Sequence, residues 1–205
     1  MSRTYSLDTE AAKQSDSGQY ISETGKYIGV FTRAEEVLSK KNTEGVEFAF
    51  KAQDGSSADF LTLWTFDKDG RSLHGFKVLN AIMTCMRVKE MNTALATVEK
   101  YDNGQRRQMQ ATVFPSLMNK PVGILLQKVW RADKPEKYKF EIFGAFDASS
   151  ELTASEILEQ KKSPERLPKM VAVLKDKHEA PKAGAHQSAP PSHQGGSDFA
   201  DDIPF

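Results

Sequence analysis

Two neighbouring stretches, VEFAFK (residues 46–51) and ADFLTLWTF (residues 58–66), decide the fold class. Apolar side chains alternate with others at the two-residue period of a β-strand in the first stretch, and the second is rich in aromatic residues and threonine, which favour strands. Asp54-Gly55, between them, is a strong hairpin signal. The sequence therefore predicts an antiparallel hairpin and a mainly β protein.

The second stretch has two candidate faces. Phe60, Trp64 and Phe66 share one face, and Leu61 and Leu63 share the other. If the two leucines point into a core, the aromatic rings point outward, where they could stack on nucleic-acid bases. The alternative is a strand buried on both faces, since aromatic residues are most often core residues.

Further elements follow on both sides of this hairpin. An earlier strand covers residues 26–33, and residues 34–38 either prolong it or form a short helical turn. The helical spacing of apolar residues predicts an amphipathic helix over residues 73–89. Residues 91–119 suggest an inserted hairpin around Asp102-Asn103-Gly104, with strand pieces at 98–101 and 109–114. Two strands at 122–131 and 138–148 form a second long hairpin.

The chain divides into four parts. Residues 1–19 form a flexible arm, 20–162 a folded body, 163–197 a flexible basic linker that includes a short apolar element at 167–174, and 198–205 an acidic tip. Thr153-Ala154-Ser155-Glu156 predicts a capped helix near the end of the body. The linker composition, rich in Lys, Pro, Ala, Gly, Ser, Gln and His, predicts a disordered tail.

Charge is distributed unevenly although the total is neutral. The 205 residues contain 28 basic and 28 acidic side chains. Residues 20–160 hold 19 of each, residues 161–197 hold 7 basic and 3 acidic, and the tip holds 3 acidic and no basic side chains. Any nucleic-acid site in the body must therefore arise from local clustering of basic residues.

The chain carries no sign of export or membrane insertion. Residues 1–20 lack the apolar core of a signal peptide, and the apolar run at 122–126 is too short to cross a bilayer. The one cysteine, Cys85, stands among Met83, Met86 and Val88, as a small buried hydrophobe would. We therefore expect a soluble cytoplasmic protein.

Clustered metal ligands or catalytic groups are lacking. His74 has no second histidine within the predicted body. Asp59, Asp67 and Asp69 lie close together, as the carboxylates of a nuclease might be spaced, but the last two sit in a turn with Gly70, where acidic residues are common for backbone reasons. We assign no metal, no cofactor and no enzymatic activity.

Basic and aromatic residues are interleaved around residues 128–139. In strand period Lys128, Trp130 and, across the turn, Tyr138 share a face. Cations that meet phosphates and rings that meet bases suit a single nucleic-acid strand. The alternative is a charged edge that keeps the sheet soluble.

The order of elements matches a five-stranded OB barrel, with an inserted segment and with the amphipathic helix between strands three and four. Such barrels bind oligonucleotides on strands two and three and with the loops after strands one and four. With the cluster at 128–139, this placement predicts these DNA-binding residues: Lys40, Lys41, Phe48, Lys51, Phe60, Trp64, Lys128, Trp130, Arg131, Lys134, Lys137, Tyr138 and Lys139.

The last eight residues have the composition of a C-terminal peptide that a partner protein binds. Four negative charges, including the terminal carboxylate, accompany too few apolar groups to form a core. Pro204 lowers the entropy lost on docking, so Phe205 can enter a pocket while its carboxylate meets a basic side chain. We expect a partner to bind Asp198, Phe199, Asp201, Asp202, Ile203, Pro204 and Phe205.

Asp201-Asp202-Ile203-Pro204-Phe205 resembles the acidic tip of bacterial and phage single-stranded DNA-binding proteins. The body is also similar to the phage-encoded members of that family, in residues 25–29, 60–64, 75–86 and 144–158. It departs from the cellular members in segment 91–119 and in its longer helix, so their DNA contacts and tetrameric state do not carry over.

The resemblance implies a protein that coats single-stranded DNA without strong sequence preference during DNA replication, recombination and repair, in the bacterial host cytoplasm if it is phage-encoded. Its tip would recruit a polymerase, helicase, primase, nuclease or recombinase, and a homo-oligomer is compatible with it. The alternative is a protein-interaction adaptor of the replication machinery that does not itself bind DNA.

Overall fold

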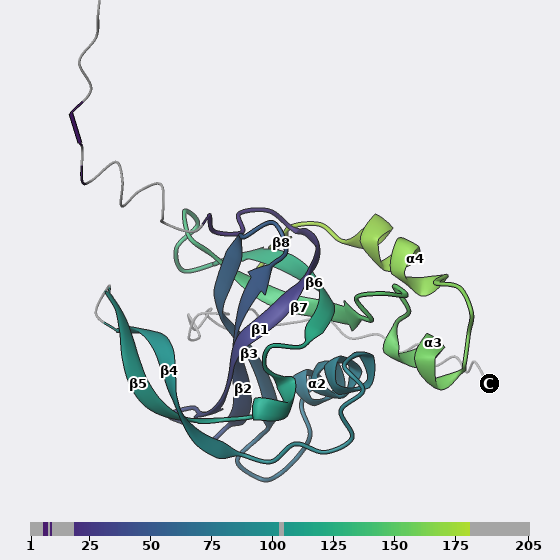
Figure 1. Cartoon of the computed structure of the whole chain (residues 1–205), viewed down its shortest axis with the longest axis horizontal. Coiled ribbons are helices and arrows are strands. Elements are labelled where there is room, and N and C mark those ends of the chain that lie inside the picture. Colours follow the sequence, from purple (N-terminus) through teal and green to yellow (C-terminus); the bar gives the residue numbers. More distant parts are fainter. Residues whose placement is uncertain (1–5, 8, 10–18, 103–104, 181–205) are drawn as a thin grey trace, which may run out of the picture.

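The computed structural model describes residues 6–7, 9, 19–102 and 105–180 (Figure 1). Within these residues the protein is mainly β, with one eight-stranded sheet and three α-helices. None of the described helices has the length and apolar character needed to cross a membrane. The elements are β1 (Gly25–Leu38), β2 (Glu44–Ala52), β3 (Ser57–Phe66), α2 (His74–Cys85), β4 (Ala94–Asp102), β5 (Gln105–Val113), the 3₁₀ turn η1 (Pro115–Leu117), β6 (Pro121–Trp130), β7 (Tyr138–Phe146), α3 (Ala154–Leu158), α4 (Arg166–Val173) and β8 (Lys177–His178).

The long strand β1 connects the rest of the sheet. It pairs with β2 over residues 29–38, with β6 over residues 25–30, and with β5 at Glu35. All pairs of strands are antiparallel except β6–β8, which is parallel. Residues 34–38 therefore prolong the first strand, and the helical alternative for them is wrong.

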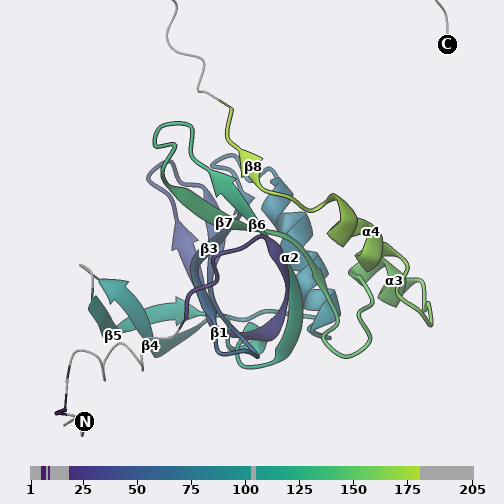
Figure 2. The ribbon, with the colours of Figure 1, turned by 90° about the horizontal axis from the view of Figure 1, so that it is seen from above.

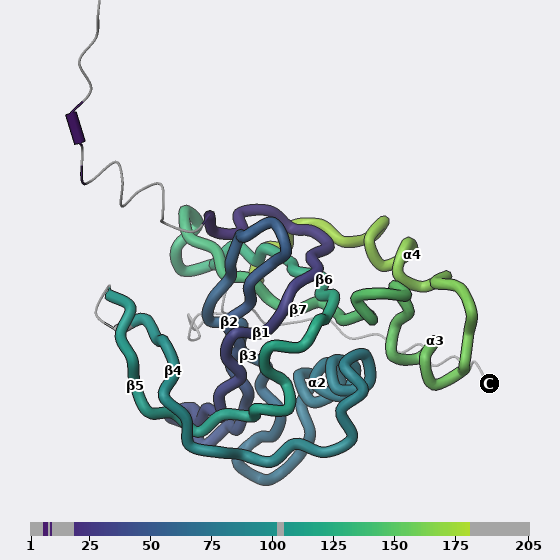
Figure 3. Tube along the Cα trace, in the orientation of Figure 1, coloured from purple at the N-terminus to yellow at the C-terminus, as the bar shows by residue number. Residues whose placement is uncertain are grey.

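Most of the expected elements are present with shifted ends. The hairpin of residues 46–66, the helix after it and the pair of strands at 122–148 are confirmed as β2–β3, α2 and β6–β7. The inserted hairpin is confirmed as β4–β5, in perfect register from Ala94 opposite Val113 to Asp102 opposite Gln105. It stands apart from the body in the trace (Figure 3).

The sheet curls strongly but stays open. Seen from above, β1, β3, β6, β7 and α2 surround a common centre, while β4–β5 projects to one side (Figure 2). β3 and β7 approach each other at the open edge, and no ladder joins them in the described residues. The five expected strands and the two of the expected hairpin account for seven of the eight strands, and only the short β8 was not expected.

The core lies between the inner face of the sheet and α2. Phe31 packs against Phe48 and Phe50, with ring centroids 4.4 and 5.7 Å apart. Ile82 and Cys85 of α2 face this cluster. Burial raises the pKa of the Cys85 thiol to about 12 and so keeps it protonated, which agrees with its expected role as a small hydrophobe.

The folded part extends beyond the expected boundary at residue 162. α4 buries Leu167 against Leu125 and Phe146, and β8 pairs with β6. The short apolar element expected at 167–174 corresponds to α4, and β8 adds a short ladder in the stretch expected to be a flexible linker, because one buried leucine and two paired residues dock a segment whose composition resembles a linker. Residues 181–205 and most of the N-terminal arm lie outside the described residues.

Glu156 joins the last two helices. The predicted capping box is present: its carboxylate accepts hydrogen bonds from the backbone N–H and hydroxyl of Thr153 at 2.9 and 2.8 Å. The other carboxylate oxygen accepts from the backbone N–H groups of Glu165 and Arg166, both at 2.7 Å. Burial favours the neutral acid, but these donors outweigh it and lower the pKa of Glu156 from 4.5 to about 2.

Replacing Glu156 with Gln should lower the free energy of unfolding at pH 7 by about 2 kcal/mol, since a charge-assisted acceptor of buried N–H groups is lost. A carboxyl with a lowered pKa stabilises the fold above its ordinary pKa, and this contribution disappears as the pH falls from 4.5 towards 2. Urea unfolding at pH 7 and pH 3 should therefore show a smaller pH dependence for E156Q than for the wild type. The exposed Glu159→Gln is the control, and an equal pH dependence in E156Q and E159Q would contradict this role.

Candidate nucleic-acid interface

The outer face of β3 carries exposed aromatic rings. Phe60 is 56% exposed and Trp64 39% exposed, whereas Leu61 and Leu63 are buried. The outward arrangement is thus confirmed, and the alternative of a strand buried on both faces is wrong. Phe66, the third ring on this face, is half-buried and packs against Phe76 of α2.

A β-bulge aims Phe60. The ladder steps from Phe48 opposite Leu61 to Phe50 opposite Ala58, so Asp59 and Phe60 together oppose one residue of β2. Phe60 has a φ of +60°, in the left-handed region that a bulky side chain seldom adopts. The bulge and this backbone conformation re-aim an exposed ring, as bulges often do beside functional sites.

An aromatic groove lies beside Phe60. Four exposed rings line it, and they come from four separate segments: Tyr20, Phe60 of β3, Tyr101 of β4 and Tyr138 of β7. The groove has a volume of about 490 Å³ and is open to solvent, with Lys139 on its wall. The structure thereby brings the predicted residues Phe60, Tyr138 and Lys139 together.

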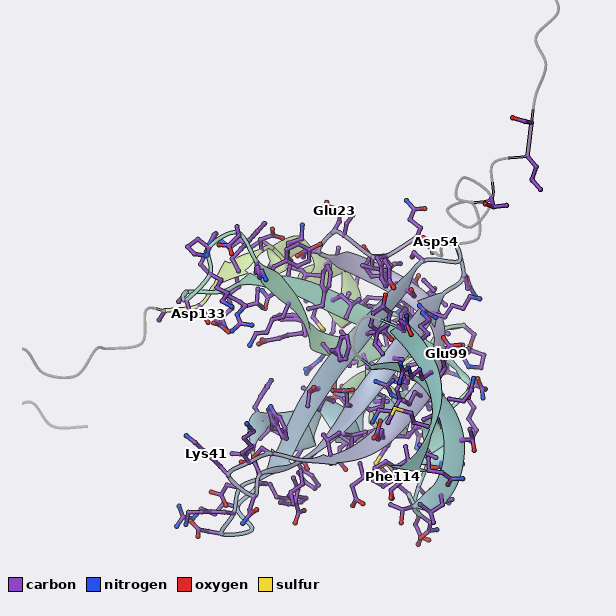
Figure 4. All side chains as sticks on the ribbon, turned by 90° about the vertical axis from the view of Figure 1, so that its left-hand side faces the viewer. Glu23, Lys41, Asp54, Glu99, Phe114 and Asp133 are labelled. Atoms are coloured by element: carbon purple, nitrogen blue, oxygen red, sulfur yellow. The ribbon has the colours of Figure 1, made fainter. Side chains whose placement is uncertain are left out.

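A second hollow surrounds Trp64. Lys40 and Lys41 of the β1–β2 turn line it with Ser39, Thr43 and Leu73, in a volume of about 420 Å³. The structure thus brings the predicted Lys40, Lys41 and Trp64 together, about 13 Å along β3 from Phe60 at 3.3 Å per residue. In Figure 4, which draws the described side chains, Lys41 lies at the lower left and Asp133, at the tip of β6–β7, at the upper left.

Rings also cluster on the β6–β7 hairpin. Trp130 and Tyr138 pack edge to face at 5.3 Å, and the Lys128 ammonium lies over both rings, at 5.5 and 4.9 Å from their centroids. The prediction that these three side chains share a face is confirmed. His178 of β8 stacks on Trp130, so the chain's own C-terminal segment partly covers that ring.

Two predicted contacts lie in positions that do not suit DNA. Phe48 is completely buried, because it shares the inward face of β2 with Val46 and Phe50. Lys128 is also buried, and its ammonium is occupied by the two rings and by Glu23 at 3.6 Å. The expectation that Phe48 faces a strand of DNA is therefore wrong, and Lys128 holds the rings instead of presenting a free charge.

The other predicted basic residues are exposed but more dispersed. Lys134 and Lys137 stand at the tip of β6–β7, and Arg131 beside them donates two hydrogen bonds, both 2.9 Å, to Asp133. Lys51 is exposed at the far end of β2 and lines neither the groove nor the Trp64 hollow. The predicted partner-binding residues 198–205 lie outside the described residues.

Sequence reasoning missed two walls of the groove. Tyr20 precedes the first strand, where it forms an isolated bridge to Ser57. Tyr101 lies at the end of β4, opposite Arg106. Interactions with Tyr20 and Glu99 raise the pKa of the Arg106 guanidinium above its ordinary value. The turn signal in the sequence predicts that Tyr101 lies near a hairpin end, and Asp102 does pair with Gln105, but no local signal places Tyr101 near Phe60.

The ligand groups that a metal site needs are His, Cys, Asp or Glu side chains that lie close together. In the described ranges no three His, Cys, Asp or Glu side chains are grouped so that they could hold a metal ion. The Asp67 carboxylate accepts hydrogen bonds from the backbone N–H groups of Asp69 and Arg71 at 2.9 Å each, as acidic residues in turns commonly do.

Comparison with known proteins identifies no relative: neither the models of known families nor the curated proteins contain a significant match to this sequence.

The strained backbone at Phe60 predicts an unusual order of stabilities. Phe60→Gly should be more stable than Phe60→Ala by about 1 kcal/mol, because glycine adopts a positive φ without a steric penalty. At Thr62, the next outward position, the order should reverse, since Gly within a strand is less stable than Ala by about 0.5–1 kcal/mol. Urea unfolding of the four variants tests this, and Ala more stable than Gly at both positions would show that the backbone of Phe60 is unstrained in solution.

Proposed function

We propose that this protein binds single-stranded DNA, without strong sequence preference, along the outer face of β3. The observation that carries the proposal is the aromatic groove, where Tyr20, Phe60, Tyr101 and Tyr138 converge from distant segments and remain exposed. Folded proteins seldom leave such a group of rings in water unless it takes a ligand. The Trp64 hollow continues the same face.

The rings favour a single strand over a duplex. Every base has a flat face, and stacking on an aromatic side chain contributes about 1–3 kcal/mol per base whatever the base identity. Bases in a duplex are already stacked on one another, so they cannot offer these faces. Lys40 and Lys41 beside Trp64 are placed to neutralise phosphates, which compensates locally for the neutral charge of the body. Lys139 on the groove wall is paired with Glu141 and Glu179 in this structure.

We also infer that the sheet is an elaborated OB barrel. β1, β2, β3, β6 and β7 follow the expected strand order, and α2 stands between β3 and β6 as the helix stands between the third and fourth strands of that fold. The β4–β5 hairpin is then an insertion that adds Tyr101 to the groove, and β8 is an addition at the edge of β6.

The proposed biological role is the coating of DNA during replication, recombination and repair in the cytoplasm, as in the phage-type single-stranded DNA-binding proteins that the sequence resembles. The protein acts without chemistry of its own and recruits partners through Asp198–Phe205. A homo-oligomer is compatible with this role. The rival role is an adaptor that binds proteins alone.

Removal of two groove rings, in Phe60→Ala/Tyr101→Ala, should weaken binding to a labelled oligo-dT by about 5- to 150-fold for each base that loses its stacking partner. Fluorescence anisotropy at several salt concentrations measures this, and log K should fall by about 0.7 per decade of salt for each phosphate contacted. Phe143→Ala is the matched control, because Phe143 is 38% exposed but lines a different groove with α2 and α4.

The single-strand preference is tested with duplex of equal length in the same titration. If the wild type, Phe60→Ala/Tyr101→Ala and F143A bind oligo-dT with equal affinity, the groove is not part of the DNA-binding site. If the wild type binds no single strand, the adaptor role is the one that remains. In that role, replacement of Trp64 and Trp130 has no effect on the binding of partner proteins.

Deletion of Asp198–Phe205 should leave binding to oligo-dT unchanged or tighter and should abolish capture of partners, since the tip carries only acidic charge. Anisotropy of the truncated and full chains, together with capture of host replication proteins on each, measures both effects. The scrambled tip, with the same composition but with Pro204-Phe205 moved inward, is the control. Loss of DNA binding on truncation would contradict the proposal that the body binds DNA and the tip binds partner proteins.

A further inference from the structure

Residues 176–179, which follow α4, lie across the ring of Trp130. We call these four residues the acidic strap. β8 runs parallel to β6, with Lys177 opposite Val129 and His178 opposite Trp130. The backbone N–H of Glu179 donates to the carbonyl of Trp130 at 2.9 Å.

Both carboxylates of the strap are bound to donors of the body. Asp176 accepts from the Trp130 indole N–H at 3.1 Å and from the Thr24 hydroxyl at 2.6 Å. These two donors hold its pKa below its ordinary value. Glu179 pairs with the ammonium of Lys139 at 2.8 Å. Both acids are therefore anchored in the charged state.

Between the two carboxylates, a flat ring is stacked on the tryptophan. The His178 imidazole lies 6.3 Å from the Trp130 ring, with 17° between the planes. A nucleotide presents the same set of groups, a planar base flanked by anionic phosphates. The strap thus supplies a hydrogen-bond acceptor to the Trp130 indole and a negative charge to Lys139, as a short piece of single-stranded DNA would. Lys139 also pairs with Glu141 of β7 at 3.0 Å.

The strap also continues the aromatic groove. Tyr138 and Lys139 line the groove, and the next ring beyond Tyr138 is Trp130, in edge-to-face contact at 5.3 Å. A strand that follows the rings from Phe60 past Tyr138 reaches Trp130, where the strap lies. The β8 ladder contains only two residues, both exposed, so the strap is held mainly by the polar contacts and the ring stack described above, without a buried apolar side chain of its own.

We propose that the acidic strap is a built-in competitor that occupies a nucleotide position on Trp130 and is displaced when single-stranded DNA binds. The inference rests on the proposed function and extends it, because it makes Trp130 and Lys139 the covered end of the site. The apparent affinity for DNA is then reduced by the fraction of molecules in which the strap is closed.

The test uses full-length variants in pairs. Asp176→Asn/Glu179→Gln removes both anchoring charges with little change in volume, and His178→Ala removes the stacked ring. Glu159→Gln/Glu165→Gln removes the same two charges from the exposed segment between α3 and α4, so it controls for net charge. Oligo-dT binding is measured by anisotropy, and Trp130 is followed by acrylamide quenching in a Trp64→Phe background, where it is the only tryptophan.

We expect D176N/E179Q and H178A to bind oligo-dT about five-fold more tightly than the wild type, as release of a mostly closed strap predicts. The control pair should bind within about two-fold of the wild type, because its charges lie away from the site. Trp130 should be more accessible to acrylamide in both strap variants without DNA, and equally protected in all DNA complexes.

Two results would contradict the strap inference without affecting the proposed function. One is that the strap variants bind oligo-dT no more tightly than the control pair, and the other is that acrylamide quenches Trp130 equally in the strap variants and the wild type. In both cases wild-type binding to oligo-dT would leave the proposed function standing. Failure of the wild type, the control pair and the strap variants to bind any single strand would overturn the proposed function and the strap inference together.

Discussion

The pairing of β1 on both of its edges is the constraint on which the rest of the structure depends. This strand has 14 residues, and its backbone groups must find partners along its whole length. β2 serves one edge, while β6 and then β5 serve the other. A side chain at Gly29 would collide with the backbone of Lys51, so the close approach of β1 and β2 requires glycine there. Because one strand receives three partners, segments far apart in the chain meet around a single face.

A buried charge cluster holds the β4–β5 hairpin to this strand. Arg33 of β1 is buried and pairs with Glu47 at 2.7 Å and with Glu35 at 3.4 Å, while Glu35 also pairs with Lys100 of β4 at 2.6 Å. Arg33 further donates to the carbonyl of Glu99 at 3.2 Å. Buried ion pairs often add little net stability, but a mismatched partner would leave a charge unpaired, so such clusters can enforce one arrangement. Here the arrangement brings Tyr101, the neighbour of Lys100, to the groove.

The proposed binding face combines rigid support with exposed rings. Trp64 stands where the start of α2 packs so closely on β3 that a side chain at Gly75 would meet its backbone. Phe60 is aimed by a bulge, and Tyr138 is held by Trp130 and the buried Lys128. A preorganised set of rings loses little conformational entropy when bases stack on it. The strap at Trp130 differs from these rings, since it is short and exposed and is held by polar contacts and one ring stack.

The sequence by itself determined the elements whose signals are local: the two-residue period of β2 and β3, the helical spacing of α2, the β4–β5 turn and the capping box at Thr153. Each depends mainly on neighbours within a few residues, so its signal can be read from a single sequence. Only the tertiary structure decided which rings face solvent and which meet. Phe48 and Phe60 are both strand aromatics, yet Phe48 fills the core because it lies opposite Leu61 on the inward face, whereas Phe60, the neighbour of Leu61, lies on the outward face and lines an open groove. Tyr20, Tyr101 and residues 176–179 reach the site through pairings over 37 to 152 positions, and such long-range contacts leave no periodic trace in a single sequence.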